Sequence, residues 1–239
     1  MRYWEKDSLK ILLSENAYPG RGIVIGCTPS GEKSAVAYFI MGRSENSRNR
    51  IFAETEDGIR TEAFDPSKMV DPSLIIYHPV RKIGDQLIVT NGDQTDTVRD
   101  CIAEGGTFEG ALDTRCFEPD APNYTPRISG MLSFGEGSFT YKLSILKSAD
   151  PEGSACSRYT FSYAPEKGAG HFIHTYKCDG NPIPSFEGEP EKVEIPEDID
   201  EFAALCWDNL NCDNKVSLYI NFTDLKTGTA ETRIINKHN

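Results

Sequence analysis

The sequence predicts an α+β fold with largely antiparallel sheets, and three observations lead to this class. Strand-like runs occur in groups that helical segments interrupt, which is typical of α+β proteins rather than of alternating parallel strands and helices. A short turn sequence with Pro and Gly, CTPSGEK, joins GIVIG (22–26) to SAVAYFIM (34–41), as expected for an antiparallel hairpin. The glycine motifs of doubly wound, P-loop and α/β-hydrolase folds do not occur in the sequence, so no motif supports these folds.

Apolar periodicity places the strands along the chain. In the segment 138–146, Phe139, Tyr141, Leu143 and Ile145 alternate with polar residues, so we expect them on one buried face. In the segment 74–80, Pro79 marks a strand end or a sheet edge, because proline has no N–H to donate to a ladder. The strands that we expect are 22–26, 34–41, 59–64, 74–80, 86–92, 128–134, 138–146, 158–164, 171–177, 215–222 and 231–236.

Two segments have helical spacing instead. Residues 95–117 predict two short helices, since Val98, Cys101 and Ile102 fall on one face. The first helix begins at a cap on Thr95 or Asp96 and ends at Gly105–Gly106, and Thr107 caps the second helix. The segment 200–210 predicts a third helix, DEFAALCWDNL. Its placement before the last two strands completes the α+β order.

Length and charge limit the domain organisation and the class of partner. The 239 residues suffice to bury a core without disulfides. We expect one domain over 1–239, with 1–17 as an N-terminal extension and 187–199 as an acidic Pro/Gly connector inside the domain. Lys and Arg number 25 and Asp and Glu 37, which gives a net charge of −12. This balance argues against a nucleic-acid surface or an anionic-membrane surface, but it allows a small basic pocket.

Apolar stretches and cysteines indicate the compartment. No run of eighteen apolar residues and no signal peptide are evident, so we expect a cytoplasmic protein without membrane contact. The seven cysteines are spread and form no CxxC pair, which favours reduced thiols. His171 and His174 fall on opposite faces of one strand, so we expect no metal site. The oligomeric state stays open between monomer, dimer and tetramer.

Four polar clusters follow strand ends, where site residues are commonly presented. They are GRSENSRNR (42–50), Tyr77 with His78, TNGDQTDT (90–97) and FEPDAPNYTPR (117–127). The guanidinium groups of the first cluster suit phosphate binding. The helix start in the third cluster suits anion binding. The carboxylate and guanidinium of the fourth cluster suit general acid–base catalysis. Each cluster also has a plain structural interpretation: a solvated loop, a core tyrosine, helix capping, or a proline turn with a surface ion pair.

These clusters, in this order, resemble the archaeal-type inosine monophosphate (IMP) cyclohydrolase family and its bacterial relatives. The similarity starts near Tyr18 and is diffuse in the C-terminal third. It rests on YPGRGIVIG (18–26), Asn49–Arg50, DPSLIIY (71–77), VTNGDQTDT (89–97), FEPD…YTPRI (117–128) and, more faintly, HTYKCDGNPIPSFEGEP (174–190). The resemblance implies a four-layer α-β-β-α sandwich like that of N-terminal-nucleophile hydrolases, without N-terminal nucleophile processing.

The resemblance also implies a reaction and its residues. The family closes the purine ring of 5-formamidoimidazole-4-carboxamide ribotide (FAICAR) to IMP, with loss of water and without a metal or redox cofactor. The implied catalytic residues are Arg50, which holds phosphate or an oxyanion, Tyr77, which donates a proton, and Glu118, which acts as base or orients the amide. The implied substrate-binding residues are Arg21, Arg48, Asn91, Asp93, Thr95, Thr125 and Arg127. Arg127 is expected to pair with Glu118 or to reach the substrate.

Two further interpretations stay open beside IMP cyclohydrolase. One is an amide-cleaving or amide-forming hydrolase that acts on a related nucleotide. The other is a purine-nucleotide-binding protein without catalysis. The arginine loop is longer than in the archaeal pattern, so Arg48 and Arg50 compete for one role, and one extra residue separates Glu118 from Arg127.

Overall fold

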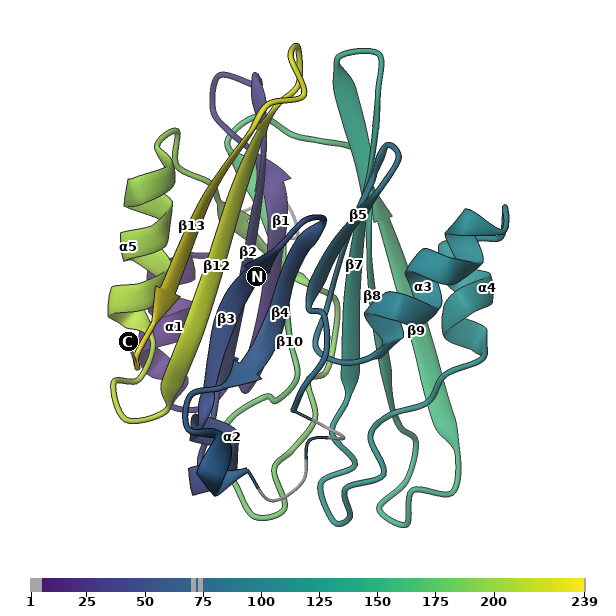
Figure 1. The fold of residues 1–239 in the computed structure, drawn as a ribbon, viewed down its shortest axis with the longest axis vertical. Coiled ribbons are helices and arrows are strands. Elements are labelled where there is room, and N and C mark those ends of the chain that lie inside the picture. Colours follow the sequence, from purple (N-terminus) through teal and green to yellow (C-terminus); the bar gives the residue numbers. More distant parts are fainter. Residues whose placement is uncertain (1–5, 70–71, 73–74, 239) are drawn as a thin grey trace.

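Two antiparallel sheets face each other at the centre of the molecule (Figure 1). The computed structural model describes residues 6–69, 72 and 75–238. The first sheet has the order β11 (Glu191–Glu194), β10 (Ala169–His174), β1 (Arg21–Cys27), β2 (Lys33–Met41), β12 (Lys215–Asp224), β13 (Ala230–Asn236). The second has the order β3 (Arg50–Thr55), β4 (Gly58–Ala63), β5 (Val80–Ile83), β6 (Gln86–Thr90), β7 (Arg127–Gly135), β8 (Ser138–Ser148), β9 (Cys156–Tyr163).

Helices cover the outer face of each sheet (Figure 1). Helices α1 (Leu9–Glu15) and α5 (Ile199–Asn209) lie against the first sheet, and α3 (Gln94–Ala103) and α4 (Phe108–Asp113) lie against the second. The short α2 (Glu45–Arg48) and the 3-10 helix η1 (Pro66–Lys68) belong to connections. The predicted α+β class with antiparallel sheets is therefore confirmed, while the kinship with N-terminal-nucleophile hydrolases stays a prediction.

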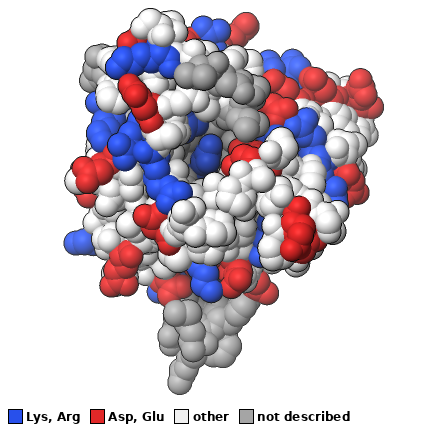
Figure 2. Space-filling view, turned by 90° about the horizontal axis from the view of Figure 1, so that it is seen from below, with Lys and Arg blue, Asp and Glu red and all other residues white. Residues whose placement is uncertain are grey.

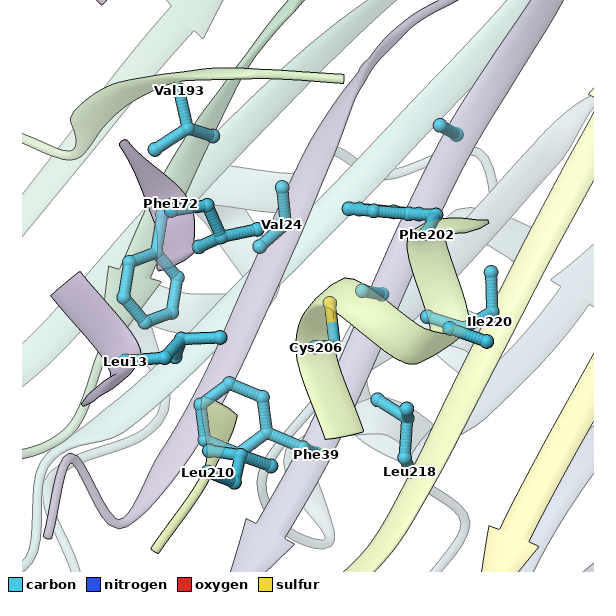
Figure 3. Close-up of a cluster of buried hydrophobic side chains, with 14 of the residues drawn as sticks. Leu13, Val24, Phe39, Phe172, Val193, Phe202, Cys206, Leu210, Leu218 and Ile220 are labelled. Carbon is cyan, nitrogen blue, oxygen red and sulfur yellow. The ribbon is translucent and has the colours of Figure 1, made fainter. Parts of the chain in front are cut away.

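Apolar side chains fill three spaces between these layers. Figure 3 shows the cluster between α1, α5 and the first sheet, where Phe39, Phe172 and Phe202 are almost fully buried. The space between the sheets holds the alternating side chains of β8, which confirms the predicted face of Phe139 and its neighbours. Val98 packs beneath α3 and α4 with Cys101 and Ile102 at its margin, as predicted.

The helix ends agree with the sequence in part. Thr107 caps α4 by accepting a hydrogen bond from the N–H of Gly110 at 3.0 Å, and Gly105 follows α3 with φ of 81°. Helix α3 itself begins earlier than predicted, with Asp93 at the N-cap. Asp93 makes no cap hydrogen bond, because its carboxylate binds Arg115 and Arg127 instead.

Other predicted boundaries were wrong. Of the expected strand 74–80, residue 74 lies outside the described residues, 75–79 are not a strand, and β5 begins only at Val80. The N–H groups of Ile75 and Ile76 both donate to the carbonyl of Pro72, so this apolar segment turns back on itself. Three further elements were not predicted, because their sequences carry too little periodicity. They are strand β3, strand β11 inside the expected connector, and helix α1 inside the expected extension. Residues 1–5 of that extension lie outside the described residues.

All helices in the described part of the chain are short. The longest, α5, has 11 residues, whereas a bilayer span needs about 20 apolar residues. No described helix is long and apolar enough to cross a membrane.

Candidate active site

Three of the predicted arginines are the first residues of three strands. Arg21 opens β1 in the first sheet, and Arg50 and Arg127 open β3 and β7 in the second. These strand starts lie at the end of the molecule where α2 is drawn in Figure 1. Figure 2 shows this end as a face with a hollow near its middle, and Lys or Arg atoms lie at the bottom of the hollow.

Arg50 is fully buried yet forms no ion pair among the described residues. Its side chain has 0% exposure. The Nε group donates to the carbonyl of Ser47 at 2.8 Å and Nη2 donates to that of Met41 at 3.3 Å. The Nη1 group has no hydrogen-bond partner in the described chain. A buried donor of this kind is costly, so this guanidinium is suited to receive an acceptor from a ligand.

Arg21 lies in the same electrostatic environment. Its Nε is also buried without a partner among the described residues. Burial lowers the pKa of Arg21, but the charge of Glu118 and the nearby tyrosines reverse this, so the pKa is raised overall. Burial and the charge of Arg21 together lower the pKa of Arg50. Two neighbouring buried guanidinium groups repel each other, which favours the binding of an anion between them.

Glu118 is the buried carboxyl of this environment. Its side chain is almost inaccessible, and its backbone N–H donates to the carbonyl of Thr125 at 2.9 Å. Burial raises the pKa of Glu118, although the charges of Arg21 and Arg127 oppose the shift. A carboxyl with a raised pKa exchanges protons closer to neutral pH, which suits general acid–base chemistry.

Tyr77 lies beside these groups and is anchored by its backbone. Its N–H donates to the hydroxyl of Thr61 at 2.9 Å, and its carbonyl accepts from the N–H of the same residue. The Tyr77 hydroxyl is 2.9 Å from that of Tyr38 on β2. Tyr77 contributes to the raised pKa of Arg21, so the hydroxyl and the guanidinium share one environment.

Side chains around the start of α3 form a closed hydrogen-bond network. The Asn91 amide donates to the carbonyl of Pro126 at 2.8 Å and accepts from the N–H of Ile128 at 2.9 Å. Gln94 accepts from Arg127 Nη1 at 2.6 Å and donates to Asn91 at 3.0 Å. The network thus fixes the start of β7, and with it the Arg127 guanidinium.

Thr95 and Thr125 also have hydrogen-bond partners within the protein. Thr95 is buried, and its hydroxyl lies 2.6 Å from that of Thr90. The Thr125 hydroxyl lies 2.6 Å from that of Tyr176 and donates to the carboxylate of Asp120. These contacts fix the loops that carry the charged groups.

Two of the predicted arginines have partners within the protein. Arg127 forms its ion pair with Asp93, at 2.8 Å, and none with Glu118. Arg48 is held by the chain itself, because it donates to the carbonyl of Gly42 at 2.8 Å and to the Asn214 side chain at 3.0 Å. Of the two competing arginines, only Arg50 keeps a buried N–H group without a partner in the described chain.

Possible metal-binding side chains do not gather into a site in the described chain. No group of three or more His, Cys, Asp or Glu side chains that could hold a metal ion occurs among the described residues. All seven cysteines are free, and Cys27 is buried.

A family model named IMP cyclohydrolase-like protein matches residues 18–228. The chain belongs to this family. It is 33% identical over 122 residues to the IMP cyclohydrolase of Methanothrix thermoacetophila, an alignment of 48% of this chain and 58% of the relative. It is 32% identical over 120 residues to that of Methanococcus aeolicus, again over 48% and 58%. With the IMP cyclohydrolase of Methanopyrus kandleri it shares 28% identity over 181 residues, which cover 71% of this chain and 89% of the relative.

The chain thus spans less than two thirds of the first two relatives that it matches. The family match begins directly at Tyr18, where the resemblance of the sequence begins as well. The first matched residue stacks on Tyr176, with ring centroids 5.7 Å apart.

Sequence reasoning missed several residues of this candidate site. Tyr38 lies inside an apolar strand and looks like a core residue, and Gln94 lies among stronger capping candidates. Tyr176 falls in a segment where the resemblance is faint. No local pattern distinguishes these residues, because each joins the site through a partner far away in the sequence.

Proposed function

We propose that this protein is an IMP cyclohydrolase that closes the purine ring of FAICAR to IMP, a step of de novo purine biosynthesis in the cytoplasm. One observation carries the proposal. Arg21 and Arg50 are both buried, the charge of Arg21 lowers the pKa of Arg50, and each keeps a buried N–H group without a partner among the described residues. An anionic ligand satisfies both donors and relieves their repulsion.

The charge of the site selects the ligand class. Asp93 is shared between Arg127 and Arg115, and Glu118 is the one buried carboxyl among the described residues that faces both Arg21 and Arg50. A phosphorylated or otherwise anionic small molecule therefore complements the site better than a neutral one. This agrees with the relatives, which are named IMP cyclohydrolases and so are named for a nucleotide.

Ring closure needs proton transfers that Glu118 and Tyr77 are suited to make. The carboxamide nitrogen attacks the formyl carbon, one C–N bond forms, and the formyl C–O bond breaks. One proton leaves each of the two substrate nitrogens, and both protons end on the departing oxygen as water. We assign Glu118 to accept a proton from the attacking nitrogen and Tyr77 to donate a proton to the departing oxygen. Arg50 or Arg21 stabilises the negative charge that develops on that oxygen. The reaction exchanges no electrons with a cofactor.

The other predicted residues support this geometry. We assign a positioning role to Asn91, Thr95 and Thr125, whose hydrogen bonds hold the loops. Arg127 borders the site with Asp93 as its counter-ion. We also propose that the layered sheets and helices are an N-terminal-nucleophile hydrolase fold used without a processed N-terminus.

The test is turnover of FAICAR, followed by the ultraviolet absorbance of IMP, in the wild type and in Glu118→Gln. Glu104→Gln, an exposed carboxylate on another element, is the control. We expect saturable turnover that is lost by about 10²-fold or more in Glu118→Gln and kept in the control. Absence of turnover in the wild type, with IMP still raising the melting temperature, would instead establish a nucleotide-binding protein. Equal turnover in both variants would refute the role of Glu118.

A further inference from the structure

A second cavity opens at the other end of the two sheets. It has a volume of about 610 Å³, within the roughly 300–1,000 Å³ that small-molecule sites occupy. Its lining comes from the β3–β4, β5–β6, β7–β8 and β12–β13 turns and the strand ends next to them. The β12–β13 and β7–β8 turns are at the top of Figure 1, opposite the end viewed in Figure 2. None of the residues assigned above to the active site lines this cavity.

The inner part of the cavity is apolar. Ile59 and Leu87 come from the second sheet, and Tyr219 comes from the first. All three are at least nine-tenths buried. Phe134 and Leu225 add half-buried apolar surface. Such a floor accepts a flat hydrocarbon or aromatic body.

One wall of the cavity is polar. Asn221 is 5% exposed and lines the cavity from β12. Its amide donates to the hydroxyl of Thr232 at 3.4 Å and accepts from that of Thr223 at 3.0 Å. A side-chain amide has two N–H donors and two lone pairs. Because the Tyr219 side chain also hydrogen-bonds to Asn221, Asn221 retains capacity for one further polar contact.

The rim of the cavity is strongly acidic. Six carboxylates line the cavity, and Lys82 is the one lysine or arginine among the lining residues. Asp57 is paired with Arg81, and Asp224 accepts backbone N–H groups of its own turn. The carboxylates of Glu54, Glu56, Asp85 and Glu136 have no ion-pair partner among the described residues.

We propose that this cavity is a second binding site, for a small organic cation with a flat apolar body, such as a protonated aromatic amine. The apolar floor takes the body, Asn221 takes a polar substituent, and the rim carboxylates hold the ammonium group. The same charges repel a nucleotide or a second copy of this chain, whose net charge is −12. The two ends of the protein thus select ligands of opposite charge.

The test compares three indole probes by isothermal titration calorimetry on the full chain. Tryptamine carries an ammonium group, tryptophol is its neutral counterpart, and indole-3-propionate is its anionic counterpart. We expect tryptamine to bind about tenfold more tightly than tryptophol, because several exposed carboxylates each contribute modestly. Indole-3-propionate should bind weakest. Raising the salt from about 50 to about 300 mM should weaken the binding of tryptamine alone.

Variants locate the site. Combined Glu54→Gln and Glu136→Gln should lower the affinity for tryptamine toward that for tryptophol, with Glu56 and Asp85 still in place. Combined Glu15→Gln and Glu104→Gln, at exposed positions outside the cavity, should leave the affinity unchanged, although the net charge changes equally. Ala230→Trp, at an exposed lining position on an edge strand, should block all three probes.

Three outcomes would overturn the proposal: equal binding of tryptamine and tryptophol, unchanged binding in the Glu54/Glu136 variant, or displacement of tryptamine by IMP. FAICAR turnover should be the same in these variants as in the wild type. The binding experiment can therefore fail without bearing on the proposed reaction, and the proposed reaction can fail without bearing on the binding site.

Discussion

Replacing Tyr77 by phenylalanine removes one hydroxyl from the pair that Tyr77 forms with Tyr38 at 2.9 Å. Tyr38 has 0% and Tyr77 6% exposure, so water does not readily replace the lost partner. A buried hydroxyl left without a partner costs about 1–3 kcal/mol. We therefore expect Tyr77→Phe and Tyr38→Phe each to lower the free energy of unfolding by about that amount. The double replacement removes both polar groups and should be nearly neutral, as apolar pairs of the same shape are.

Turnover separates the two tyrosines where stability does not. If Tyr77 donates a proton to the departing oxygen, Tyr77→Phe should lose about 10²-fold or more in kcat. Tyr38→Phe should keep most of its turnover, because Tyr38 acts only through Tyr77. The double variant should fold as stably as the wild type and still be slow.

The assays are urea unfolding and FAICAR turnover on all four proteins. A double variant destabilised by the sum of the two single variants would show that the hydroxyls are not coupled. Comparable turnover in Tyr77→Phe and the wild type would remove Tyr77 from the mechanism.

Three further predictions concern charge, space and packing. Because burial raises the pKa of Glu118 above its ordinary value of 4.5, the folded state favours the neutral carboxyl. That contribution to stability is present below pH 4.5 and is lost as the pH rises through the raised pKa. The melting temperature of Glu118→Gln should therefore rise relative to that of the wild type as the pH rises. A difference in melting temperature that does not change with pH would contradict this. Gly92→Ala places a Cβ against Arg127 Nη1, too close for an ordinary contact, so it should impair turnover, measured by KM and kcat, with little change in ligand binding at the distant cavity. Phe202→Ala, at a fully buried position in α5, should cost about 3–5 kcal/mol in urea unfolding and leave the KM of the folded protein unchanged; a cost below about 1 kcal/mol would mean that this core relaxes into the space.

Much of the fold follows from local patterns. The alternation in β8 and the runs in β1, β2 and β12 predict strands at nearly their observed bounds, because side chains of a strand alternate between faces. Thr107 and Gly105 predict helix ends for an equally local reason. Strand β3 and strand β11 escape prediction, since their burial comes from neighbouring strands rather than from their own composition.

The segment around Tyr77 shows the limit of composition. Its apolar residues suit a strand, yet 75–79 turn, because Pro79 lacks a donor and Thr61 offers Tyr77 both a donor and an acceptor. Such partners are not visible in the local sequence.

Sequence patterns predict the fold class and most strands, and the family resemblance points to the charged residues of the candidate site. Three features appear only in the folded chain: the buried N–H that Arg50 rather than Arg48 leaves without a partner among the described residues, the pairing of Arg127 with Asp93, and the acidic cavity at the far end. The reason is physical: periodicity acts between near neighbours in the chain, whereas burial of a charge, its counter-ion and the shape of a cavity depend on side chains that only folding brings together.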